Sequence, residues 1–98
     1  MADEINISPS ALRSAARQMN APVSSLSDVK RSLNKINGDV GEAWVSRYTD
    51  SYKDRVEQVI RKIQNTQNEI ESIQRALRST ANRVEALERQ LAQMFADS

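Results

Sequence analysis

The feature that most constrains the fold is a heptad repeat in the second half of the chain. Apolar residues recur every seven positions there, and the segment 56–95 contains neither Gly nor Pro. The first series is Val56, Ile63, Ile70, Leu77, Val84 and Leu91. A second series follows three residues later, at Val59, Thr66, Ile73, Thr80, Leu87 and Met94. Because both series fall on one side of an α-helix, the repeat predicts a single long helix with one seam.

A matching repeat fills the first half of the chain. Ser8-Pro9 is typical of a helix start, with Ser as the N-cap and Pro in the first turn. Residues at heptad spacing follow, at Leu12, Met19, Leu26, Leu33 and Val40, with Ala15, Pro22, Val29 and Ile36 between them. An interior Pro removes a backbone hydrogen bond and clashes one turn back. We therefore expect a kink or break near residues 18–22.

The two glycines, Gly38 and Gly41, indicate where the first helix ends. The second helix starts either at Asp39, whose spacing to Glu42 resembles a capping box, or at Ser46. We expect a connection over about 38–46. The sequence then predicts one domain over 1–98, with a tail at 1–7, a first helix at about 8–37 and a second at about 47–95.

A short connection between two heptad helices predicts an antiparallel hairpin, and the fold class is all-α. With the turn centred near residue 41, facing residue numbers sum to about 82, which places Leu26 opposite Val56 and Leu12 opposite Ile70. The first helix would cover the second only as far as about residue 73 and leave roughly 30 Å of seam uncovered from Leu77 onward. An exposed apolar row of this length favours pairing with a second hairpin into a four-helix bundle.

Composition excludes most chemistry. The chain has no Cys and no His, and its 14 basic and 13 acidic residues leave a net charge of +1. We therefore expect no enzyme, cofactor, metal, nucleic-acid partner or membrane insertion. Three Glu-first pairs mark the predicted solvent side: Glu57–Arg61, Glu71–Arg75 and Glu85–Arg89. The first ten residues lack the pattern of a secretory signal, so we expect export, if it occurs, without a cleaved leader.

Two groups of residues are candidate recognition elements. Trp44, Tyr48 and Tyr52 are spaced by four, and they either close the end of the hairpin or form a recognition surface beside the turn. The second group is Val84, Glu88, Leu91 and Phe95, whose spacing puts all four on one side of the last helix. As a bare pattern, this second group is either a heptad seam with an acid at its edge or a docking motif.

These features together resemble the WXG100 family of type VII secretion. The residues that carry the resemblance are the Ile5-x-Ile7-x-Pro9 entry, Leu12-Arg13, Trp44, Tyr48 and Tyr52. The family signature Trp-x-Gly is here Trp44-Val45-Ser46, where Ser46 is able to cap the second helix. The family's tail signal of Tyr followed by an acid is absent beyond Tyr52. The second recognition group resembles instead an export pattern of one hydrophobe, an acid and two further hydrophobes.

The resemblance implies a non-enzymatic secreted protein, or an accessory partner in type VII secretion, that dimerises and presents an export signal. Its partner would be a second copy or a related hairpin, with a larger secreted client and a secretion ATPase as further partners. The expected bundle seam is Leu12, Met19, Leu26, Leu33, Val56, Ile63, Ile70, Leu77 and Leu87. The alternative hypothesis is a cytoplasmic coiled-coil adaptor or chaperone that caps the helical region of a larger client.

Overall fold

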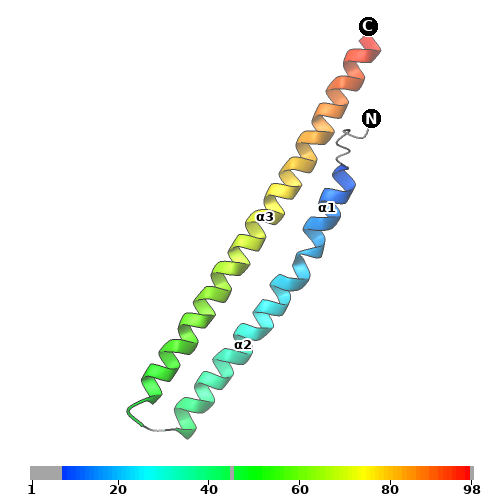
Figure 1. Cartoon of the computed structure of the whole chain (residues 1–98). Coiled ribbons are helices and arrows are strands. Elements are labelled where there is room, and N and C mark those ends of the chain that lie inside the picture. The colour runs from blue at the N-terminus through cyan, green and yellow to red at the C-terminus, as the bar shows by residue number, and fades with distance from the viewer. Residues whose placement is uncertain (1–7, 45, 98) are drawn as a thin grey trace, which may run out of the picture. The chain divides into compact units, whose positions relative to one another are not determined.

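The chain is all-α, as the heptad repeats predict. The computed structural model describes residues 8–44 and 46–97, and it contains three helices: α1 (Pro9–Gln18), α2 (Asn20–Ala43) and α3 (Thr49–Asp97) (Figure 1). Two compact units divide the chain. The terminal unit is Met1–Asn20 with Glu71–Ser98, and the connection unit is Ala21–Ile70. Within each unit the helices pack as an antiparallel pair, so the predicted hairpin is confirmed. The predicted tail at 1–7 lies outside the described residues.

The start of α1 and the break after it follow the local sequence. The Oγ of Ser8 accepts a hydrogen bond from the N–H of Ala11 at 3.2 Å, with Pro9 in the first turn. At the other end, the N–H of Met19 donates to the carbonyl of Ala16 at 3.3 Å, which tightens the last turn. Pro22 has no N–H to donate to the carbonyl four residues earlier. The interruption therefore falls within the predicted segment 18–22.

The predicted end of the first helix was wrong. α2 continues through Gly38 and Gly41 to Ala43, and no described glycine has a positive φ. The N–H of Trp44 still donates to the carbonyl of Val40 at 2.9 Å. Glycine permits a helix end but does not impose one. Five residues, 44–48, therefore join the helices in place of the expected 38–46.

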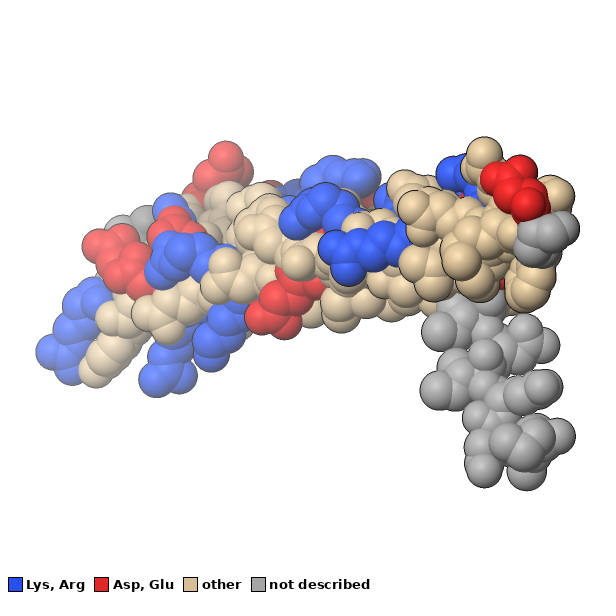
Figure 2. Space-filling view, turned by 90° about the horizontal axis from the view of Figure 1, so that it is seen from above, with Lys and Arg blue, Asp and Glu red and all other residues tan. Residues whose placement is uncertain are grey.

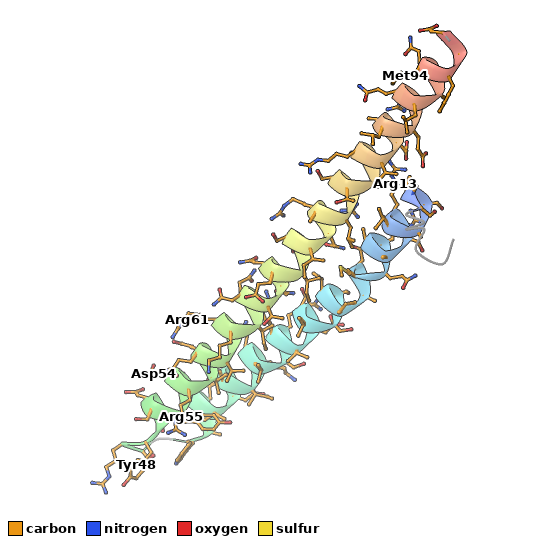
Figure 3. The ribbon with its side chains drawn as sticks, turned by 45° about the horizontal axis from the view of Figure 1, so that its top comes forward. Arg13, Tyr48, Asp54, Arg55, Arg61 and Met94 are labelled. Atoms are coloured by element: carbon orange, nitrogen blue, oxygen red, sulfur yellow. The ribbon has the colours of Figure 1, made fainter. Side chains whose placement is uncertain are left out.

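The predicted register was also wrong. In the connection unit, an Asn37–Lys53 and a Val23–Gln67 hydrogen bond join α2 to α3, and the residue numbers of both pairs sum to 90 rather than about 82. In the terminal unit, Arg13, which is labelled in Figure 3, pairs with Glu85. α1 therefore covers α3 as far as Glu85, and not only to residue 73. The physical reason is the shorter connection, which moves the centre of the turn toward the C-terminus.

The seam between the helices differs in composition from the predicted one. On α3 it combines the first heptad series with residues four positions later, which are Ile60, Gln67, Gln74 and Ala81, and with Lys53 one heptad before Ile60. The second predicted series, three positions later, is exposed instead, with Val59 46% and Leu87 59% accessible. Among the described apolar residues only Ala16 and Ala81 are fully buried. The helix pair therefore has a thin core that contains amide side chains.

Candidate functional site

Thr49 organises the connection between α2 and α3. Its Oγ1 accepts a hydrogen bond from the N–H of Ser46 at 3.0 Å and donates to the carbonyl of Trp44 at 2.8 Å. The Oγ of Ser46 accepts from the N–H of Tyr48 at 3.1 Å. These bonds satisfy backbone groups of the connection, among them groups that the end of α2 and the start of α3 leave unpaired. Ser46 therefore lies just before α3 and shares the capping of this helix with the buried Thr49. Val45, the middle residue of the predicted turn motif, lies outside the described residues.

The aromatic residues beside the connection separate into two groups. The rings of Trp44 and Tyr52 meet edge to face, with centroids 6.0 Å apart and planes at 69°. Tyr48 contacts Arg47 instead: the guanidinium lies 4.9 Å from the ring centroid and donates to the phenol oxygen at 2.8 Å. Trp44 is 42% and Tyr48 56% exposed. The three predicted aromatics thus do not share one stack, and both groups reach the surface. Tyr48 is labelled at the connection in Figure 3.

A shallow hollow of about 300 Å³ lies beside Trp44 in the connection unit. Its lining is Gly41, Trp44, Ser46, Thr49, Asp50 and Lys53. The lining combines one apolar ring with a carboxylate and an ammonium group. Small-molecule pockets are mostly apolar, whereas this hollow is lined mainly by polar and charged residues.

The second recognition group continues the internal seam beyond α1. Val84 is half-buried in the terminal unit, while Glu88, Leu91 and Phe95 are exposed, with Phe95 78% accessible. Their spacing of four, three and four prolongs the line of Leu77 and Ala81. The end of α3 therefore presents an apolar ridge with one carboxylate; Met94 marks this end in Figure 3.

A second apolar row, here called the outer row, runs beside the seam on each helix. Its members are Val29 and Ile36 on α2 and Val59, Ile73, Leu87 and Met94 on α3, each at least 45% exposed. On both helices the row is displaced from the seam in the same rotational sense. In an antiparallel pair of right-handed helices, such positions emerge on the same side. The connection unit thus carries Val29, Ile36 and Val59 on one face.

The predicted bundle seam is divided between these two surfaces. Leu87 belongs to the outer row and is 59% exposed. The other eight residues are half-buried in the seam within the chain: Leu12, Met19, Leu26, Leu33, Val56, Ile63, Ile70 and Leu77. The surface available to a partner is therefore mainly the outer row and the end of α3.

Charged side chains of both signs are interspersed on the face seen in Figure 2. Ion pairs within residues 8–44 and 46–97 are Arg13–Glu85 and Asp28–Arg31. Glu85, expected to pair with Arg89 along its own helix, pairs across to α1 instead. The described residues contain no group of three or more His, Cys, Asp or Glu side chains placed to hold a metal, and none of their helices is long and apolar enough to span a membrane.

Comparison with known families decides the classification. The family model described as WXG100, proteins of 100 residues with WXG, matches residues 4–89. The chain belongs to the WXG100 family. Searches of curated proteins and of solved structures gave no significant match. The WXG100 proteins are small, helical, non-enzymatic proteins associated with type VII secretion, and members form dimers. The matched segment includes the Trp44 connection and ends before Leu91.

Sequence reasoning missed several residues that shape these surfaces. Thr49 was not singled out, although its spacing from Ser46 is that of a reciprocal capping pair. Gln67 and Gln74 fall outside both predicted apolar series, yet both are buried in the seam. Their spacing of seven, four residues after Ile63 and Ile70, was the available signal.

Proposed function

We propose that this WXG100 protein pairs with a second helical hairpin through the outer row, and that the pair presents the Trp44 connection and the end of α3 to a type VII export machinery. The observation that carries the proposal is the row of exposed aliphatic side chains on one face of the connection unit. Val29, Ile36 and Val59 are each 45% to 46% exposed. Covering each side chain contributes on the order of 1 kcal/mol or more, so the row favours association.

The thin seam supports the same proposal. The described part of the chain buries no large apolar side chain completely. A chain of about 100 residues with so little core gains much of its stability from a partner. In the proposed pair, the seam within each hairpin and the outer row between hairpins together form the core of a four-helix bundle.

The solution mass of matched variants tests the pairing. Val59→Glu places a charge in the outer row, whereas Gln58→Glu places the same charge at the neighbouring exposed position. We expect Val59→Glu to weaken self-association at least about tenfold, because a buried carboxylate replaces about 1 kcal/mol or more of apolar burial in each copy and adds the cost of desolvating a charge. Gln58→Glu should retain the mass of the parent. Equal masses for both variants and the parent would contradict pairing through this row.

Purification alone and co-expression with candidate partners together distinguish a second copy, a related hairpin and a larger client. A purified chain that is a stable helical dimer supports pairing with a second copy. A poorly helical monomer that becomes helical with a related hairpin supports a heterodimer within the same secretion system. Stabilisation by a large non-secreted client, with no export of either protein, would instead support the adaptor function.

A further inference from the structure

Gln74 forms two hydrogen bonds from α3 to the N-terminal segment of the terminal unit. Its side chain is 6% exposed, and its Nε2 donates to the carbonyl of Ala16 and to the Oδ1 of Asn20, both at 2.8 Å. A primary amide has two N–H donors, and both are used here. The two acceptors lie four residues apart, on the same side of the chain segment that faces α3. The contact therefore depends on how far α1 is displaced along α3.

Gln67 makes the corresponding contact in the connection unit. It is 3% exposed, and its Nε2 donates to the carbonyl of Val23 at 2.9 Å and to the Oγ of Ser27 at 2.8 Å. Asn37 adds a third cross-helix amide, with Nδ2 donating to the carbonyl of Lys53 at 3.3 Å. In all three contacts the residue numbers of the amide and of the carbonyl sum to 90. The three amides therefore specify one register.

The apolar pattern does not specify that register by itself. Because the pattern repeats every seven residues, sliding the helices by one heptad keeps apolar residues in the seam. A slide that lowers the sum to 83 would move the turn to the segment between Gly38 and Gly41, where the backbone is most easily bent. This is close to the arrangement that the heptads and glycines alone predict.

The slide affects the three amides differently. Gln67 would move opposite Ala16 and Asn20, the acceptors that Gln74 now uses, and would stay satisfied. Gln74 would move opposite Pro9 and Arg13, where the carbonyl of Pro9 would take the place of that of Ala16, but the guanidinium of Arg13 offers no acceptor for the second N–H. Asn37 would move opposite Ser46, which lies outside the helices. A buried N–H without an acceptor is costly, so the slide is opposed by the loss of the side-chain acceptor of Gln74.

We propose that Gln74 is a register-determining residue, which selects the observed pairing of α1 with α3 over the pairing displaced by one heptad. The register sets the point at which α3 continues beyond α1, now near Glu85. In the displaced pairing that point would lie about one heptad earlier and would uncover Ala81 and Val84. The consequence for presentation of the α3 end rests on the proposed function, whereas the register itself does not.

Disulfide trapping tests the proposal, since the chain has no cysteine of its own. Lys30→Cys with Lys53→Cys places two thiols at seam positions whose numbers sum to 83, so this pair closes only in the displaced register. Lys30→Cys with Ile60→Cys sums to 90 and reports the observed register. The rate of intramolecular closure is measured in a glutathione redox buffer at low protein concentration, and non-reducing electrophoresis separates monomers from crosslinked dimers.

The decisive comparison is between two substitutions of the same chemistry. Gln74→Met removes the amide while keeping an unbranched side chain, and we expect closure of the displaced pair to accelerate at least about tenfold relative to closure of the observed pair. Gln67→Met removes an amide that is satisfied in both registers, so the ratio should stay within about twofold of the parent. Gln74→Lys restores a donor and should return the ratio toward that of the parent.

Three results would overturn the proposal. The first is equal acceleration by both Met variants, and the second is no acceleration by Gln74→Met. The third is loss of helical circular dichroism in Gln74→Met but not in Gln67→Met, because that result would assign Gln74 to stability rather than to the choice of register. None of these results depends on secretion, so they are distinguishable from failure of the proposed function.

Discussion

The guanidinium of Arg13 on α1 pairs with the carboxylate of Glu85 on α3, 72 residues away in the sequence. The same guanidinium donates to the Oδ1 of Asn82 at 2.8 Å. Both side chains of the ion pair keep about a third of their surface exposed, at 36% and 33%. Solvent therefore screens the pair, and its contribution to stability is modest.

Removing this ion pair should destabilise the terminal unit slightly. In a double-mutant cycle of Arg13→Ala and Glu85→Ala, we expect a coupling free energy of about 0.5–1 kcal/mol that decreases in 1 M salt. Urea unfolding at fixed protein concentration measures it. Arg89→Ala is the matched control, because Arg89 is the predicted helical partner of Glu85 and the structure gives it no such bond. A larger coupling between Glu85 and Arg89 would contradict the observed pairing.

The stability of the protein should depend on the hydroxyl group of Thr49 and much less on its methyl group. Thr49→Val removes the bonds to Ser46 and Trp44 at nearly constant volume, and we expect a cost of about 1–2 kcal/mol in the free energy of unfolding. Thr49→Ser keeps both bonds and should cost less than half as much. Thermal unfolding of the two variants side by side measures the difference. Equal destabilisation would indicate that packing, and not the hydroxyl, holds the connection.

Gly38→Ala should stabilise the protein. Gly38 lies inside α2, and an added Cβ would meet nothing within 4 Å. Alanine in a helix interior is favoured over glycine by about 0.5–1 kcal/mol. At Gly41 the added Cβ would lie 3.1 Å from the Nζ of Lys53, so Gly41→Ala should gain less, because that flexible side chain must move. Destabilisation by Gly38→Ala would show that the connection at 38–46 forms in solution.

Export should depend on the exposed ends of the hairpin. Trp44→Ala and Phe95→Ala are each expected to fold and dimerise, since these side chains are 42% and 78% exposed, yet to accumulate less in culture supernatant. Cytoplasmic levels and solution mass are measured on the same variants. Gln58→Ala, on the exposed polar side of α3, is the control. Normal secretion of both variants would remove the proposed roles of the connection and of the tail group.

Local signals in the sequence predicted much of the fold but not its register. Ser8-Pro9 and Pro22 act over one helical turn, and both effects appear where they were expected. The glycines gave a wrong prediction of the helix end, because the stability that two glycines cost a packed helix is small compared with that of the contacts on either side of them. Gln67 and Gln74 resolve the register, but their role emerges only when the opposite carbonyls are in place. The α3 part of the outer row is recognisable in the sequence as a heptad series. Its prediction as part of the seam was wrong, because which series is buried depends on the opposite helix.

The last turns of α3 carry two apolar lines at once. Leu91 and Phe95 prolong the seam, whereas Leu87 and Met94 prolong the outer row, and the two lines are separated by less than a quarter turn of the helix. Because they are so close, the two lines form one broad apolar strip at this helix end. In the proposed pairing, a sister chain that covers Leu87 and Met94 would therefore also lie against the edge of the line formed by Leu91 and Phe95.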